Sequence, residues 1–183
     1  MYTSDAGSFA IQFARAFGAH VIATASKAGA ELVKSLGADE VLDYTAANFS
    51  APLESDASKV DIVYDTVGGF GYWSDVGRRV LKPGGSYITI AGDGHEKMSL
   101  GKVARAGFKQ ITRSWPFEET KYATYSAFPD GAQLAHIAQL MEEGKIRGVV
   151  DSTFPLSDAA AAFARLQTGR ARGKVVVVVI PAP

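Results

Sequence analysis

Residues 7–44 read GSFAIQFARAFGAHVIATASKAGAELVKSLGADEVLDY, and this segment predicts a helix, a strand, a second helix and a second strand in close succession. Apolar side chains recur at three- and four-residue steps in its first eleven residues, which is typical of a helix packed on one side. Gly18 and Gly37 are placed to end the two helices, because glycine adopts a left-handed conformation at little cost. The short apolar runs 20–25 and 40–44 favour strands buried on both faces.

The same alternation continues along the chain. Further strands are predicted at 60–65, 86–91 and 110–115, and further helices at 71–81, 100–108 and 130–144. Helices alternating with short apolar strands predict an α/β fold, a Rossmann-like doubly wound and mostly parallel sheet. Such a fold normally opens with a strand before the first helix, so we expect an N-terminally truncated version of it.

The last segment predicts a C-terminal strand-helix-strand appendage. Its strands are expected at 148–153 and 175–180, and its helix begins after Ser157, a good N-cap, and runs to Leu166. We therefore expect a truncated dinucleotide-binding domain over 1–147. Residues 148–183 would then pack on that domain or on a partner.

Composition excludes several classes of protein and site. The 183 residues contain 19 acidic and 19 basic side chains, so no overall charge attracts nucleic acid or anionic lipid. The sequence has no cysteine, which excludes disulfides and thiolate metal sites, and we expect no metal. No apolar run reaches the ~20 residues that span a bilayer, and residues 1–7 lack the features of a signal peptide. We expect no membrane or nucleic-acid partner and a cytoplasmic location.

The start of the first helix is a candidate phosphate site. Gly7 and Ser8 open the helix, where backbone amides and the helix dipole favour an anion. Asp5, however, puts a carboxylate next to the place where a diphosphate would lie. An N-cap with no ligand is the alternative interpretation.

Ser26 and Lys27 follow the second strand, where a Rossmann fold meets the adenosine ribose. A carboxylate there would favour NAD, whereas a hydroxyl and an ammonium favour the 2′-phosphate of NADP(H), and the phenol of Tyr44 ends the neighbouring strand. In the alternative interpretation Ser26 caps the second helix, Lys27 is solvated and Tyr44 packs at the strand end.

The next strand ends in a second candidate site. Thr66, Val67 and Gly68 follow it directly, at the strand end where such sheets bind ligands, and glycine allows a ligand to approach closely. An ordinary turn would look the same. The aromatic segment 117–129 is predicted to be irregular, and either lines a substrate pocket or covers a sheet edge.

Several motifs in this order resemble the C-terminal portion of the zinc-independent medium-chain dehydrogenases/reductases, in particular their quinone oxidoreductase and reticulon-interacting-protein-like branch. The motifs are DTVGG at 65–69, LKPGG at 81–85 and FPLSDAAAAF, then GRARGK, between 154 and 174. The resemblance extends from about Gly7 to Ile180. It implies an NADPH-dependent oxidoreductase that transfers hydride to a quinone, an enone or a similar small carbonyl substrate.

The resemblance also implies site residues. Ser26, Lys27 and Tyr44 match 2′-phosphate contacts, and Thr66, Val67 and Gly68 match a turn that lines the cofactor. It further assigns cofactor contacts to Ala91, Gly92 and Lys174. No catalytic residue is predicted; Tyr122, Tyr125 and His95 are only loose candidates for proton donation.

Members of that family begin with a β-rich domain and a first Rossmann strand, which we expect to be absent here. Three hypotheses address the gap: residues 175–180 insert into the central position, a homodimer or strand-swapped assembly pairs the open edges, or the chain is a fragment. The alternative function is a truncated non-redox homologue without cofactor, acting on a small hydrophobic molecule or as an interaction module.

Overall fold

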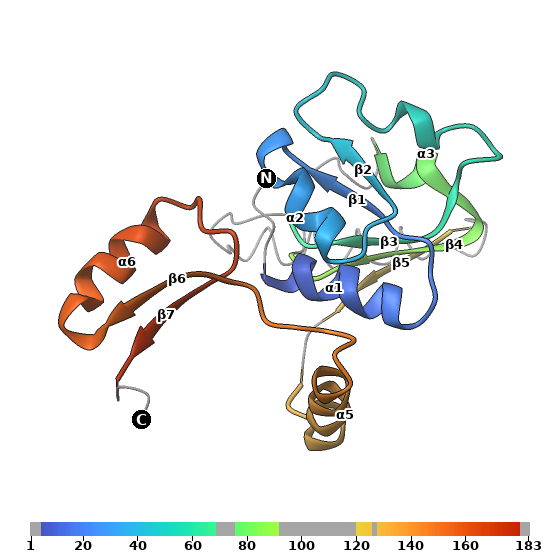
Figure 1. The fold of residues 1–183 in the computed structure, drawn as a ribbon. Helices are drawn as coiled ribbons and strands as arrows, with labels where there is room; N and C mark the ends of the chain where they lie inside the picture. Colours follow the sequence, from blue (N-terminus) through green and yellow to red (C-terminus); the bar gives the residue numbers. More distant parts are fainter. Residues whose placement is uncertain (1–4, 69–75, 92–119, 126–127, 180–183) are drawn as a thin grey trace, which may run out of the picture. The chain divides into compact units, whose positions relative to one another are not determined.

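The helix predicted after Gly7 and the strand that follows it both form (Figure 1). The structure is a computed structural model that describes residues 5–68, 76–91, 120–125 and 128–179. It comprises two compact units, one formed by residues 1–47 and 129–183 and the other by residues 48–128. The predicted domain boundary at 147/148 lies inside the first unit and stays a prediction.

The amino-terminal part of the first unit is a parallel strand pair with its helices. Its elements are α1 (Asp5–Ala16), β1 (Ile22–Ala25), the 3₁₀ turn η1 (Lys27–Gly29), α2 (Ala30–Ser35) and β2 (Glu40–Asp43). Gly18 and Gly37 end the helices with φ of 80° and 106°, as predicted. The core consists of seven buried apolar side chains: Ile11, Val21, Ala23, Ala25, Val33, Leu36 and Ala38.

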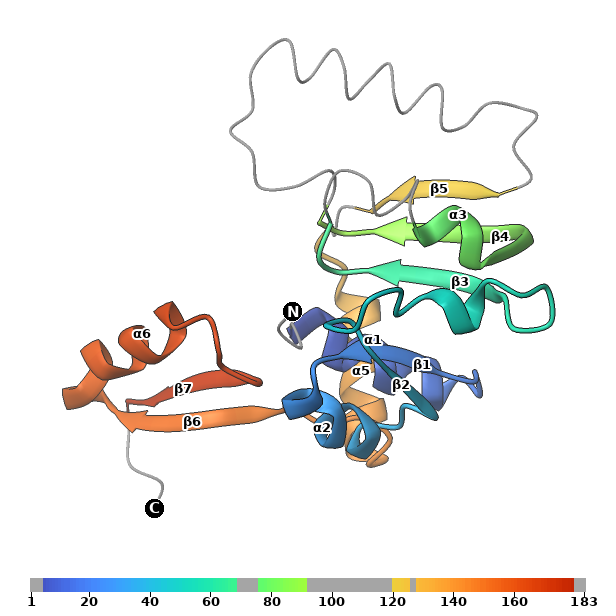
Figure 2. The same cartoon turned by 90° about the horizontal axis from the view of Figure 1, so that it is seen from above.

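The second unit contains a three-stranded parallel sheet, seen in Figure 2. Its elements are η2 (Ala51–Leu53), β3 (Val60–Asp65), the short helix α3 (Arg78–Val80), β4 (Leu81–Thr89) and β5 (Lys121–Thr124). The strand order is β3-β4-β5. Leu81, Tyr87 and Tyr122 form the core, with Val60 and Val63 packed against it.

Three predictions in this unit were wrong. The helix predicted to end at Leu81 ends at Val80, because Leu81 has extended backbone and begins β4. Residues 82–85 do not separate two elements; they form a bulge within β4, since the register jumps from Val60↔Leu81 to Ile62↔Ser86. Segment 117–129, predicted to be irregular, contains β5. The helix predicted at 100–108 and the strand at 110–115 lie outside the described residues.

The carboxyl-terminal part of the first unit is a helix followed by a strand-helix-strand segment, as predicted. Its elements are α5 (Gly131–Glu142), β6 (Val150–Pro155), η4 (Leu156–Asp158), α6 (Ala159–Gln167) and β7 (Lys174–Val178). The N-cap of α6 is Asp158, not Ser157, because the 3₁₀ turn precedes the helix. Helix α6 packs along both strands of the pair (Figure 1).

Strand β7 does not take the central position that one hypothesis gave to residues 175–180. It pairs in parallel with β6, from Val150↔Lys174 to Pro155↔Val178. That hypothesis was wrong, because the valine run finds its partner in the neighbouring strand.

The sheet topology confirms the α/β class with parallel strands. In the order 3-2-1-4-5-6, β2 and β1 correspond to strands 3 and 2, and β3, β4 and β5 to strands 4, 5 and 6. Among the described residues, no strand pairs with the second edge of β1 or with that of β3.

Candidate cofactor site

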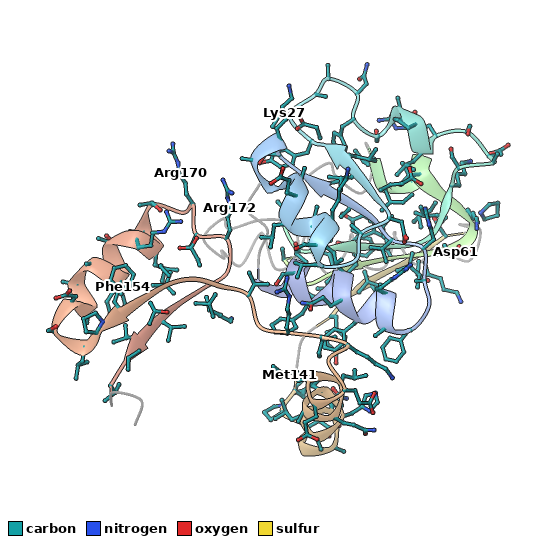
Figure 3. The ribbon with its side chains drawn as sticks, in the orientation of Figure 1. Lys27, Asp61, Met141, Phe154, Arg170 and Arg172 are labelled. Carbon is teal, nitrogen blue, oxygen red and sulfur yellow. The ribbon has the colours of Figure 1, made fainter. Side chains whose placement is uncertain are left out.

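Ser26, Lys27 and Tyr44 lie together at the carboxyl ends of β1 and β2. The register pairs Ala25 with Asp43, so Ser26 and Tyr44 come next on adjacent strands, and the Tyr44 amide donates to the Ala25 carbonyl at 3.3 Å. Lys27 opens η1, in the connection from β1 to α2 (Figure 3). The parallel register therefore brings together three side chains that the sequence separates by up to 18 positions.

The hydroxyl of Ser26 is not used to cap a helix. Ser26 precedes η1 with extended backbone, ψ 164°, and its side chain makes no capping hydrogen bond, while the N-cap of α2 is Gly29. The interpretation in which Ser26 caps the second helix is therefore not what the structure shows. The hydroxyl is left able to donate to a ligand.

Ser26 and Lys27, but not Tyr44, line a hollow of about 430 Å³, in the size range of ligand sites. Its lining residues come from β1, η1, α2 and β2: Ala25, Ser26, Lys27, Ala30, Lys34, Asp39, Glu40, Val41 and Asp43. Two of the three acids have partners elsewhere. Arg15 lies 3.1 Å from the Asp39 carboxylate, and His20 lies 2.9 Å from that of Glu40.

Asp43 is the third acid of the hollow, and sequence reasoning missed it. Its Oδ1 accepts hydrogen bonds from the Thr45 hydroxyl at 2.6 Å and the Thr45 amide at 2.9 Å. These bonds, and more weakly the Lys27 ammonium, hold the pKa of the Asp43 carboxyl below its usual range. The available signal was a carboxylate at the carboxyl end of a parallel strand.

Gly7 and Ser8 lie in the first turn of α1, where a helix presents amide groups. Ser8 is buried, and its carbonyl accepts a hydrogen bond from the Gln12 side chain. Gln12 also exchanges hydrogen bonds with the backbone of Arg147, at 2.8 and 3.1 Å, and so fixes this turn against the segment after α5. The assignment of Gly7 and Ser8 to a phosphate remains a prediction.

The turn after β3, in the second unit, is organised by Asp65. Its Oδ1 accepts from the Val67 and Gly68 amides, both at 3.0 Å, and its Oδ2 from the hydroxyls of Tyr87 at 2.9 Å and Thr89 at 3.1 Å. The two turn amides are thus directed to Asp65 rather than to a ligand. The turn can offer carbonyls, the Thr66 hydroxyl and close approach at Gly68, whose φ is 69°.

The ends of β3, β4 and β5 are aligned, since Asp65 pairs with Thr89 and Thr89 with Thr124. The Ala91 amide donates to the Thr89 hydroxyl at 3.3 Å, which places Ala91 at the same edge. Gly92, the predicted neighbour of Ala91 in the site, lies outside the described residues. Sequence reasoning missed Asp65 and Thr89 as the groups that hold this edge together.

The remaining candidates have different surroundings. Lys174 begins β7, in the other strand pair of the first unit, and its amide donates to the Val149 carbonyl at 2.7 Å. Tyr122 is buried and stacks on Tyr87, with ring centroids 5.5 Å apart, so it belongs to the core and is not a proton donor to a substrate. Tyr125 is 54% exposed and stays a candidate, while His95 lies outside the described residues.

Two features are absent from the described part of the chain. No three histidine, aspartate or glutamate side chains are grouped so that they could hold a metal ion. No helix there is both long and apolar enough to cross a membrane.

Residues 36–177 match the family model described as "zinc-binding dehydrogenase", which covers more than half of the chain. The chain belongs to this family. The match includes β2, Tyr44, the Asp65 turn and the β6-α6-β7 segment, and it confirms the expected medium-chain dehydrogenase/reductase relationship.

Named relatives support the same assignment. The chain is 37% identical over 182 residues to the NAD(P)H oxidoreductase RTN4IP1 of Mus musculus, covering 95% of this chain and 45% of that protein. It is 36% identical over 179 residues to a 2-methylene-furan-3-one reductase of Solanum lycopersicum, covering 96% and 38%. The quinone oxidoreductase of Coxiella burnetii has a similar structure, with a TM-score of 0.70, 28% identity and coverage of 95% and 49%. The chain thus spans about half the length of the relatives it matches.

Proposed function

We propose that this chain forms the dinucleotide-binding part of an NADPH-dependent oxidoreductase that transfers hydride to a quinone, an enone or a similar small carbonyl compound. The observation that carries the proposal is the juxtaposition of Ser26, Lys27 and Tyr44 on the ends of two paired strands, with a hollow lined by Ser26 and Lys27. Names of relatives support this substrate class, since they include an NADPH-dependent alkenal/one oxidoreductase of Arabidopsis thaliana.

The chemistry of the three side chains suits a phosphomonoester. An ammonium, an aliphatic hydroxyl and a phenol can each donate to phosphate oxygens, and the ammonium adds a charge-assisted bond. The cofactor would supply the hydride, and this chain would bind and orient it. In the second unit, Asp65 would hold the Thr66–Gly68 turn in one conformation, and the assignment of this turn to the cofactor stays a prediction.

The proposal includes a mechanism without a catalytic metal, as the resemblance to the zinc-independent branch implies, and this part of the enzyme contains no cysteine to provide a thiolate ligand. It also includes a homodimer or strand-swapped assembly, since β5, β6 and β7 each pair on one side only in the described sheets. Sedimentation equilibrium would test the assembly. A cytoplasmic location stays a prediction, because some named relatives are mitochondrial or chloroplastic.

Fluorescence titration of the 183-residue chain with NADPH tests the proposed function. We expect saturable binding that Lys27→Ala weakens about ten-fold, the effect of losing a charge-assisted contact. Lys145→Ala is the matched control, because Lys145 pairs with Glu143 on another part of the chain and does not line the hollow. Absence of saturable binding by a folded chain would contradict the proposal. Reduction of quinone and enone acceptors then tests the substrate class.

A further inference from the structure

Asp43 places a carboxylate in the same hollow as Ser26 and Lys27. In NAD-binding Rossmann folds a carboxylate after the second strand accepts a hydrogen bond from the ribose 2′-hydroxyl. Here Ser26 occupies that place, but Asp43 lies opposite Ala25 on the adjacent strand, one residue from the same strand end. A carboxylate on the neighbouring strand therefore lines the same hollow as Ser26 and Lys27.

The Asp43 carboxylate has one oxygen available. Both Thr45 donors bind Oδ1, so within the described residues Oδ2 accepts no hydrogen bond. The Thr45 bonds fix the orientation of the carboxylate and favour its ionised form. Oδ2 can then accept a hydrogen bond from a ribose hydroxyl.

Lys27 is not neutralised by a direct partner. Among the described residues it has no carboxylate within ion-pair distance, although Asp43 is close enough to interact with it electrostatically. A 2′-phosphate would therefore meet the attraction of Lys27 and the repulsion of Asp43 in one hollow. A 2′-hydroxyl would meet an acceptor and no repulsion.

We propose that Asp43 is a specificity-determining residue that lets this site accept NADH as well as NADPH, by accepting the ribose 2′-hydroxyl and by opposing the 2′-phosphate. This inference rests on the proposed function. It makes Lys27 and Asp43 opposing determinants: Lys27 raises the preference for NADPH, and Asp43 lowers it.

The test is the ratio of dissociation constants for NADH and NADPH, measured by titration in the unmodified chain and in Asp43→Asn. Asparagine keeps an Oδ1 that can accept the Thr45 hydrogen bonds, removes the charge and replaces the Oδ2 acceptor by an amide donor. We expect NADPH to bind more tightly and NADH more weakly, so that the ratio rises roughly two- to five-fold, the range for exposed charges. Asp158→Asn is the matched control, since it removes an equal charge outside the hollow and makes no side-chain capping bond.

A second variant keeps the test independent of any disturbance of the 43–45 turn. Lys27→Gln should lower the ratio, chiefly by weakening NADPH. The increase in NADPH affinity caused by Asp43→Asn should be smaller in 0.5 M salt, because salt screens interactions between exposed charges. Binding of both cofactors with a ratio unchanged by Asp43→Asn would overturn this inference and leave the proposed function standing. Binding of neither cofactor would overturn both.

Discussion

Asp65 accepts four hydrogen bonds, two from the turn that follows β3 and two from hydroxyls on β4. Tyr87 and Thr89, which supply the hydroxyls, are 3% and 1% exposed. Buried donors that lose their acceptor keep the full cost of desolvation, so the carboxylate acts as the common partner of all four groups. At the scale of single residues, it is the structural centre of the second unit's strand ends.

Asp65→Ala is predicted to lower the free energy of unfolding by about 3 kcal/mol or more, because four donors lose one acceptor. Asp65→Asn should cost markedly less, since its Oδ1 still accepts from the turn amides and the two hydroxyls can rotate. Urea denaturation followed by fluorescence measures both. Equal losses in the two variants would show that the hydrogen bonds are not the source of the stability.

The predicted site residues that the structure brings together are those whose proximity follows from their position along the chain. Ser26 and Lys27 come directly after a strand, and Tyr44 ends the next one, so parallel pairing alone predicts that they meet. Asp43 and Asp65 were missed because their roles depend on the direction of each side chain and on its partners. Those are set by register and packing, which sequence pattern does not specify.

At the scale of elements, an ion pair joins the parts of the β6-α6-β7 segment. Arg165 of α6 donates to both oxygens of Asp151 on β6, at 2.7 and 2.8 Å. The Arg172 amide, in the loop before β7, donates to the same carboxylate at 2.9 Å. Asp151 is nearly buried, with 9% of its side chain exposed. The carboxylate thus fixes the helix and the loop to the strand.

These contacts predict how stability depends on pH. The Arg165 bonds and the Arg172 amide hold the pKa of Asp151 well below its usual range. The unfolded state therefore binds protons more readily than the folded state, and the free energy of unfolding should fall as the pH drops below about 4. Asp151→Asn should flatten this dependence between pH 2 and 5, whereas Asp158→Asn should not. Denaturation curves at several pH values measure it, and an unchanged slope in Asp151→Asn would contradict the assignment.

Gly173 is the second residue that fixes the conformation of the β6-α6-β7 segment. Its φ is 147°, and a Cβ atom there would lie 2.4 Å from the Val149 carbonyl oxygen. Gly173→Ala is predicted to lower the free energy of unfolding by about 2 kcal/mol or more, because the loop must shift away from β6. Gly148→Ala is the control, as no atom lies within 4 Å of its added Cβ. Thermal unfolding compares them, and similar melting temperatures would argue against a close contact.

The bounds of some elements were predictable from the sequence, and those of other elements were not. Strand β3 has the predicted bounds, because turn residues on both sides of its apolar run define where the strand begins and ends. The bulge at 82–85 was missed because Lys-Pro-Gly-Gly normally forms a turn between two elements. Strand β5 was missed because an aromatic and polar segment normally forms a loop that covers a sheet edge. In both cases pairing with a neighbouring strand overrides local preference.

At the scale of the whole molecule, the fold class was predictable and the arrangement of the C-terminal strand was not. Parallel strands connected by helices follow from the sequence, and β1-β2 and β3-β4-β5 pair as the Rossmann order requires. The valine run at 175–179 is equally compatible with a central strand and with a paired outer strand. Its partnership with β6 depends on non-local contacts with residues at 150–155.

The central claim is that the ends of β1 and β2 recognise a 2′-phosphate, and comparison of 2′,5′-ADP with 5′-AMP tests it most directly. The two ligands differ only in that phosphate, and amide NMR shifts report which residues respond. The account predicts saturable shifts at Ser26, Lys27 and Tyr44 with 2′,5′-ADP, and a higher dissociation constant for 5′-AMP. Equal affinities for the two ligands, or shifts that do not include these residues, would contradict it.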